Sequence, residues 1–272
     1  MPLLYVLWIV ALLTIIAAAT HTSGTVSYTL TRNTADIARQ EALAEAALNL
    51  AVLSLLDKRP DKRPRGDGAP RKLVFEDAEI GVSIQDELGR IDLNAADAPL
   101  LAGLFRAAGT PAQEADTIAD RIIDWRDSDD LRRLNGAEKA DYHRADLSAW
   151  PRNAPFQSVD ELKLVSGMTV GLFRRVEPVL TVYSGKPTID PRVAPSLGRQ
   201  ALFGGTRSVH LSSPNAAPIN PAVSLNGRAF VVRIDLRSRQ SPVSYEAVIR
   251  LTGNPQAPYW LMKWKRRWAP SH

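Results

Sequence analysis

The chain has 272 residues and contains no cysteine, which excludes a disulfide framework, a thiolate metal site and a cysteine nucleophile. Its 45% hydrophobic content indicates a globular protein of one large or two small domains. The net charge of +5 is uneven, because residues 191–272 carry +10 and residues 1–190 carry −5. The basic C-terminal part could bind an acidic partner, such as nucleic acid, anionic lipid or an acidic protein surface. The alternative is that its charged side chains are simply exposed to solvent.

Residues 1–24 are predicted to be a transmembrane segment. Residues 3–19 form an uncharged apolar run, and a helix of roughly 25 Å over this run is at the short end of what crosses a hydrocarbon core of about 30 Å. A cleaved signal peptide is the alternative, but no Lys or Arg precedes the run. A signal-anchored enzyme would share the same segment. We favour a retained membrane helix because a helical pattern continues beyond the run.

An amphipathic stalk helix is predicted over residues 25–57. The stretch from Tyr28 to Asp57 contains no proline or glycine, so nothing in it breaks a helix. One face carries apolar or small residues at helical spacing, namely Leu43, Ala47, Leu50 and Ser54. The two segments together predict one long helix, apolar in its first half and amphipathic in its second.

Residues 58–90 are predicted to be a connecting loop followed by the first strands. Three prolines and two glycines break the helix between residues 58 and 72, where charged residues are frequent. Residues 73–75 form a short apolar run. In residues 79–86, Ile80, Val82 and Ile84 alternate with polar side chains, which predicts a half-buried strand.

A helical domain is predicted over residues 91–178. Asn94 or Asp97 can cap a first helix, and Pro111 can open a second. Ser158 followed by Glu161 is a capping-box pattern for a third helix. The aromatic residues expected to pack the core of this domain are Trp125, Trp150 and Phe156.

Strand patterns return in residues 179–272. Residues 179–183 predict one strand, and three later runs linked by turn residues predict an antiparallel meander, at 229–236, 245–251 and 259–264. Residues 185–226, rich in Pro, Ser and Gly, predict a long loop. The predicted fold class is therefore α+β, with a long N-terminal helix, an antiparallel sheet and a large all-helical domain inserted between strands.

An acidic loop in the helical domain is the strongest candidate for a site. Calcium takes about 6–8 oxygen ligands from such irregular loops, so a calcium site is one interpretation. The loop is not an EF-hand, because Arg132 stands where the EF-hand glycine would be. The alternative is ion pairing inside the loop with Arg126, Arg132, Arg133 and Lys139. The six candidate ligands are Asp124, Asp127, Asp129, Asp130, Glu138 and Asp141.

Nucleic-acid binding and catalysis are both poorly supported. Residues 107–111 and 167–169 resemble the turns of helix-hairpin-helix modules, but each lacks one glycine. The helical domain is also acidic, which opposes phosphate binding. The four histidines lack metal-ligand spacing and no nucleophile motif occurs, so we assign no catalytic residue and expect no enzyme.

Six segments carry a family resemblance, namely GRIDLNA from Gly89, DWRDSDD from Asp124, NGAE from Asn135, PRNAPF from Pro151, SVDEL from Ser158 and TVYSG from Thr181. Together they resemble the general secretion pathway protein K family, the K-type minor pseudopilins of bacterial type II secretion systems. The resemblance implies a pilin-like sheet packed on the long helix, with a helical insert of the SAM or helix-hairpin-helix kind between strands. It also implies a calcium ion bound in the insert.

The resemblance further implies a non-enzymatic subunit that caps the tip of a short periplasmic filament. A single span would hold it in the bacterial inner membrane, with most of the chain in the periplasm. Its implied partners are the inner-membrane assembly platform and the I-type and J-type minor pseudopilins, which bind through long helices, here near Leu43, Ala47 and Leu50. The alternative function is a membrane-tethered helix-hairpin-helix DNA-binding protein of a competence-like machine.

Overall fold

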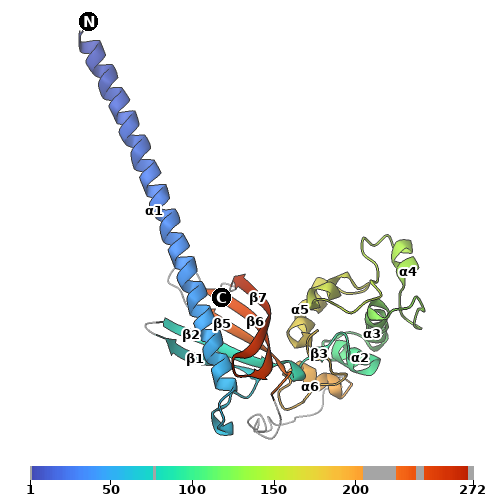
Figure 1. Ribbon diagram of the computed structural model, residues 1–272. Helices are drawn as coiled ribbons and strands as arrows, with labels where there is room; N and C mark the ends of the chain where they lie inside the picture. The colour runs from blue at the N-terminus through green and yellow to red at the C-terminus, as the bar shows by residue number, and fades with distance from the viewer. Residues whose placement is uncertain (1, 76–77, 205–224, 237–241, 269–272) are drawn as a thin grey trace. The chain divides into compact units, whose positions relative to one another are not determined.

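The computed structural model describes residues 2–75, 78–204, 225–236 and 242–268 (Figure 1). The chain divides into two compact units, Met1–Ala47 and Leu48–His272. The first unit consists of helix α1, which continues into the second unit, and α1 spans Pro2–Leu55 in all. The single long helix predicted from the sequence is therefore present.

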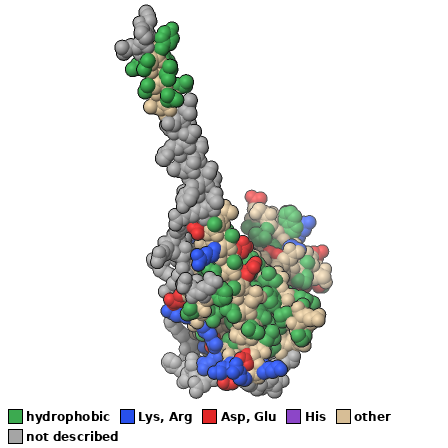
Figure 2. Space-filling model, turned by 60° about the vertical axis from the view of Figure 1, so that its left-hand side comes forward, with side chains coloured by type: hydrophobic (Ala, Val, Ile, Leu, Met, Phe, Trp, Pro, Cys, Tyr) green, Lys and Arg blue, Asp and Glu red, His purple; other side chains and the backbone are tan. Residues whose placement is uncertain are grey.

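The N-terminal part of α1 exposes large apolar side chains from Leu4 to Leu13 (Figure 2). The side chains of residues 15–32 lie outside those described. Among the residues that the structure does describe, no helix has both the length and the apolar character needed to cross a bilayer. The membrane span predicted within residues 1–24 lies partly outside the residues whose side chains are described, and it stays a prediction.

The last three turns of α1 bury a different face from the predicted one. Leu48, Ala51, Val52 and Leu55 are buried at helical spacing, whereas Leu50 is 37% exposed. Of the predicted stripe, Ala47 is fully buried, while Leu43 and Ser54 are half-buried. The exposed part of the stripe is open to a partner helix, and its contact with one stays a prediction.

A five-stranded antiparallel sheet forms the body of the second unit. Its order is β1-β2-β5-β6-β7, so the predicted α+β class and the meander of the last three strands are confirmed. β1 already begins at Asp67, inside the predicted loop 58–72. The strands are β1 Asp67–Phe75, β2 Ala78–Asp86, β5 Ala229–Leu236, β6 Val243–Asn254 and β7 Ala257–Trp268.

The chain between β2 and β5 is inserted between two neighbouring strands, since Asp86 of β2 is paired with Phe230 of β5. A short parallel ladder brings the ends of the predicted helical domain together, because Ile91 of β3 is paired with Leu180 of β4. The helices of this insert lie around that ladder in Figure 1. The elements are β3 Ile91–Asp92, β4 Leu180–Thr181, α2 Ala98–Ala107, α3 Ala112–Arg126, α4 Lys139–Arg144, α5 Val170–Val176 and α6 Ser196–Leu202, with 3-10 turns at Glu87–Gly89, Val159–Leu164 and Glu177–Val179; a further turn, Pro60–Lys62, precedes β1.

Local signals in the insert had mixed outcomes. Asp97 caps α2 by accepting a hydrogen bond from the Leu100 amide at 2.9 Å, and Pro111 precedes α3, as predicted. Ser158 makes no capping hydrogen bond, and the segment after it is a 3-10 turn, so the capping-box prediction was wrong. The predicted loop 185–226 contains α6, and its residues 205–224 lie outside the described part of the chain.

Candidate functional site

An aromatic cluster supports the acidic loop from beneath. Trp125, at the end of α3, is 1% exposed, and its ring lies 5.9 Å from that of Tyr142 and 6.1 Å from that of Phe156. Asn94 fixes the Phe156 backbone, because its Nδ2 donates to Phe156 O at 2.9 Å and its Oδ1 accepts from Phe156 N at 2.7 Å. Trp150 is 45% exposed and stacks on His143, so the prediction that it packs this core was wrong.

Arg126 does not serve the acidic loop. Its guanidinium donates to the carbonyl oxygens of Leu93 and Ala96, which hold α3 against the segment before α2. Burial lowers the pKa of Arg126, and Asp92 and Asp127 act in the opposite direction. Within the described part of the chain, Arg126 bonds to those carbonyls and forms no ion pair with a loop carboxylate.

The other basic residues of the loop bond to groups at its border. Arg133 Nε lies 2.9 Å from Asp120 Oδ1, and Arg132 lies 3.4 Å from Asp141. Lys139 Nζ sits 5.4 Å from the centre of the Trp150 ring. Among the described residues, none of the four basic side chains forms an ion pair with the remaining five candidate ligands.

Asp120 orders the far side of the loop although the sequence did not single it out. It accepts hydrogen bonds from the Asn135 amide at 3.2 Å and from Asn135 Nδ2 at 3.1 Å. Although partial burial acts to raise the pKa of Asp120, Arg133 and Asn135 hold it below its ordinary value. Asp120 is therefore a charged organiser of the loop.

Asp124 is fully buried under the same loop. Both of its oxygens accept from the Arg133 amide, at 3.3 and 3.4 Å, and the Ala137 amide also donates to it. A Cβ at Gly136 would lie 2.7 Å from Asp124 Cγ, so only glycine allows this approach. Burial raises the pKa of Asp124 to about 6, and the charge of Asp127 adds to the increase.

Glu138 and Asp127 are buried acceptors without donors. Among the described residues, both carboxylate oxygens of Glu138 and the Oδ1 atom of Asp127 have no hydrogen-bond partner. Burial raises the pKa of Glu138 to about 7, with further contributions from the negative charges of Asp124 and Asp127. Burial also raises the pKa of Asp127, with help from Asp129. The negative charges of these groups therefore raise one another's pKa, while Arg133 and Arg126 offset part of the increase at Asp127.

The remaining candidates are placed differently. Asp129 and Asp130 are exposed, and Asn153 Nδ2 donates to Asp130 Oδ1 at 2.8 Å and to the Asp129 carbonyl at 2.9 Å. Asp141 caps α4 by accepting from the Glu138 amide at 3.0 Å, and it pairs with Arg132 and Arg144. Within the described ranges, no three His, Asp or Glu side chains stand where they could hold one metal ion as they are.

A family model for type II secretion system (T2SS) protein K matches residues 46–185, which is more than half of the chain. The chain belongs to the type II secretion system protein K family. Type II secretion system protein K of Klebsiella pneumoniae is 29% identical over 195 residues, covering 65% of this chain and 60% of that protein. The same protein of Dickeya chrysanthemi is 32% identical over 124 residues, covering 42% of this chain and 33% of that protein.

The fold also matches a solved structure. A chain in the crystal structure of the GspK–GspI–GspJ complex from the enterotoxigenic Escherichia coli type 2 secretion system superposes with a TM-score of 0.63 at 19% identity. The match covers 88% of this chain and 99% of that chain. Membership of the protein K family does not favour the DNA-binding alternative.

The sequence analysis missed Asp120, and it quoted Gly136 and Asn153 only within the segments NGAE and PRNAPF, with no role in the site. Asp120 lies in the middle of the regular helix α3, and its position in the sequence carries no pattern that marks a site residue. Asn153 has a positive φ of 51°, a conformation that asparagine tolerates, but its partners lie 23 and 24 residues earlier. Gly136 carried a usable signal, because a glycine next to a carboxylate run often marks a close approach of the backbone.

Proposed function

We propose that this protein K family member is a non-enzymatic minor pseudopilin that caps the tip of the periplasmic filament of a type II secretion system. It would assemble there with I-type and J-type minor pseudopilins. The observation that carries the proposal is the match to a chain of the GspK–GspI–GspJ complex over nearly its whole length.

The position of the insert supports a place at the tip. Residues 87–228 leave the sheet after β2 and return at β5, the strand next to it. A block of this size on every subunit would crowd the successive turns of a thin helical filament. On a single terminal subunit it has free space.

The partner surface is proposed on the exposed face of α1. Leu50 is 37% exposed and Leu53 is 66% exposed, so both apolar side chains are available to another helix. Leu43 is half-buried and remains a candidate. Ala47 is fully buried, so it is withdrawn as a residue that touches a partner.

A single charge on this face tests the proposal. Leu53→Asp should reduce pull-down of the I-type and J-type partners by the full chain, because an unpaired carboxylate would be desolvated in the interface. The matched control is Val170→Asp on α5, which has the same 66% exposure and introduces the same charge. Equal capture by both variants would refute the interface, and normal exoprotein secretion in a deletion strain complemented by Leu53→Asp would oppose the assembly role.

The proposal also places the N-terminal part of α1 at the inner membrane, in contact with the assembly platform. Its support is the series of exposed apolar side chains from Leu4 to Leu13 (Figure 2). Extraction of the full chain from bacterial membranes by carbonate tests this placement. Release into the soluble fraction would contradict it.

We further propose that the acidic loop binds calcium. Asp124, Asp127 and Glu138 are the proposed ligands, because two of them carry buried oxygens without a donor and none has an ion-pair partner among the described residues. Their side chains would have to move to hold one ion together. Asp129 and Asp130 follow in the same loop, and their exposed carboxylates could contribute further oxygen ligands. Asp141 is a weaker candidate, because its carboxylate caps α4 and pairs with Arg144. Bound calcium would supply the positive charge that this group of carboxylates lacks.

Thermal unfolding with and without calcium tests this part. Calcium should raise the Tm of the full chain, since a ligand at about a hundred times its Kd stabilises the native state by about 2.7 kcal/mol. The Asp127→Asn/Glu138→Gln variant should lose the response. The control is Glu114→Gln/Asp116→Asn, which makes the same charge change at exposed positions of α3. An identical calcium response in both variants would exclude these ligands.

A further inference from the structure

A small charged cleft lies between the sheet and the insert, away from the acidic loop. Arg233 of β5 and Lys263 and Arg267 of β7 line it from the sheet, and Arg90 and Glu177 line it from the insert. Its volume is about 40 Å³. Since a water molecule needs about 10–15 Å³ by the same measure, the cleft has room for a group of a few heavy atoms.

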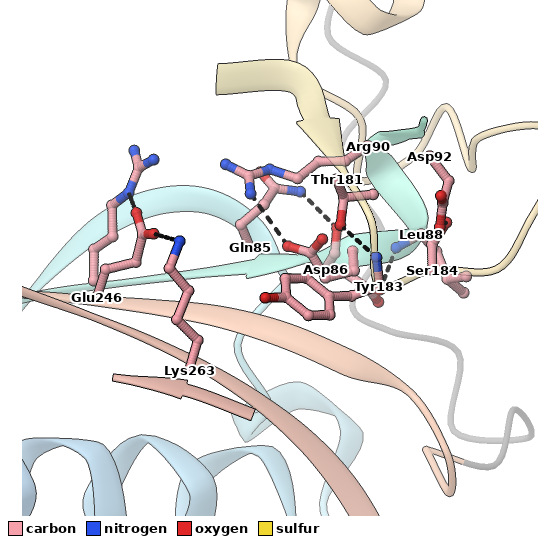
Figure 3. A network of polar contacts seen from close by, with 12 residues as sticks. Gln85, Asp86, Leu88, Arg90, Asp92, Thr181, Tyr183, Ser184, Glu246 and Lys263 are labelled. Carbon is pink, nitrogen blue, oxygen red and sulfur yellow. Dashed lines mark hydrogen bonds and ion pairs between the residues drawn. The ribbon is translucent and has the colours of Figure 1, made fainter. Parts of the chain in front are cut away.

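Three cations of the cleft converge on one carboxylate. Glu246 of β6 is 7% exposed, and its oxygens lie 3.3 Å from Arg233 Nε, 3.4 Å from Lys263 Nζ and 3.2 Å from Arg267 Nη2. Figure 3 shows Lys263 directed at Glu246 from the neighbouring strand. Burial acts to raise the pKa of Glu246, but Arg267, Arg233 and Lys263 together hold it below its ordinary value.

The charges of the cleft do not balance. The second carboxylate available to these three cations is Glu177, 3.3 Å from Arg267. Arg90 is neutralised by Glu87 at 3.2 Å, outside the cleft lining. Asp160, also at the cleft, lies 2.6 Å from Lys163. With these two pairs included, the described residues place five cations against four carboxylates, which leaves one positive charge in excess.

Two buried donors of the cleft also lack acceptors. The Nε atoms of Arg90 and Arg267 are buried and have no hydrogen-bond partner in the part of the chain that the structure describes. The Arg90 side chain is only 10% exposed, so this unpaired N–H is desolvated at a cost. An incoming oxygen atom would satisfy it, and an oxygen that carries negative charge would also balance the cleft.

We propose that this cleft binds a small oxyanion of about one negative charge, such as a carboxylate or a phosphate group. Lys263 and Arg267 would hold it from the sheet and Arg90 from the insert, since Arg guanidinium groups match the geometry of such oxygens. Because the bound group touches both parts, it would fasten the insert to the sheet. This assignment is independent of calcium and of partner assembly.

Calorimetric titration of the full chain tests the site. Acetate and inorganic phosphate, compared with chloride at equal ionic strength, should show saturable binding and raise the Tm. A terminally blocked Gly-Asp-Gly peptide provides a further arm. Stronger binding of the peptide than of acetate would assign the oxyanion to a protein segment, and stronger binding of phosphate or acetate would assign it to a free small anion.

Two variants distinguish specific oxyanion binding in the cleft from non-specific attraction of anions to the basic strand β7. Lys263→Gln should weaken oxyanion binding about tenfold, the change expected when one charged contact is lost. Arg266→Gln removes the same charge from an exposed position on the other face of β7, where it is paired with Tyr245, and should change binding less than about twofold. Equal effects of the two variants, or no saturable binding of any of the three probes, would overturn the proposal.

Discussion

Gly136→Ala should destabilise the insert, because Gly136 lies directly over a buried carboxylate. The added Cβ would be 2.7 Å from Asp124 Cγ and nearer still to its Oδ2 atom. Asp124 cannot simply turn away, since it is fully buried and accepts hydrogen bonds from the amides of Arg133 and Ala137. Either the carboxylate or the loop backbone must move.

The expected cost follows from these contacts. Forcing one extra carbon into a packed site costs about 1–3 kcal/mol. A hydrogen bond to a charged group contributes about 1.5–3 kcal/mol, and the 3.3 Å bond from the Arg133 amide is long enough to belong at the low end. A loss of about 3 kcal/mol is therefore expected, which corresponds to a fall in Tm of about 6–12 °C for a unit of this size.

Urea unfolding and thermal melting of the full chain provide the measurement. The matched control is Gly171→Ala in α5, where the nearest atom to the new Cβ is Arg175 Nη1 at an ordinary 3.8 Å. That change should be neutral or stabilising by up to about 1 kcal/mol, because alanine favours a helix over glycine. If Gly136→Ala melts with the wild type, the close approach of the loop to Asp124 is wrong.

Two further predictions concern the core and the sheet. Phe156→Ala should lower the free energy of unfolding in urea by about 3–5 kcal/mol, because its buried ring stacks on Trp125. Trp150→Ala should lower it by less than about 1 kcal/mol, because Trp150 is exposed. Comparable losses in the two variants would contradict the burial of Phe156. Glu246 has a lowered pKa, so the stability that it contributes is present above its ordinary value of 4.5 and is lost as the pH falls through the lowered value. Glu246→Gln should therefore weaken the pH dependence of the free energy of unfolding between about pH 3 and 6. Glu114→Gln, at an exposed position, should leave that dependence unchanged. The same pH dependence in both variants would refute the role of the Glu246 cluster.

Elements stabilised by neighbouring residues could be predicted from the sequence. The alternation of Ile80, Val82 and Ile84 identified β2, and Asp97 identified the start of α2. The capping-box prediction at Ser158 failed because Glu161 has other partners, which the Ser-x-x-Glu spacing does not reveal. The carboxylate of Glu161 accepts from the Gln157 amide at 3.0 Å and pairs with Arg152 instead.

The acidic loop shows what the sequence by itself determined and what only the tertiary structure decided. The composition of residues 124–141 determined that carboxylates and arginines would be crowded together, and that calcium or ion pairs were the two ways to organise them. It could not decide which arginine meets which carboxylate. Arg126 is drawn to the carbonyls of Leu93 and Ala96, 33 and 30 residues earlier, and Arg133 is drawn to Asp120 on α3. Those distant partners exist only once α3 has packed against the segment before α2. Among the described residues, that packing leaves both Glu138 oxygens and the Asp127 Oδ1 atom buried without a hydrogen-bond partner.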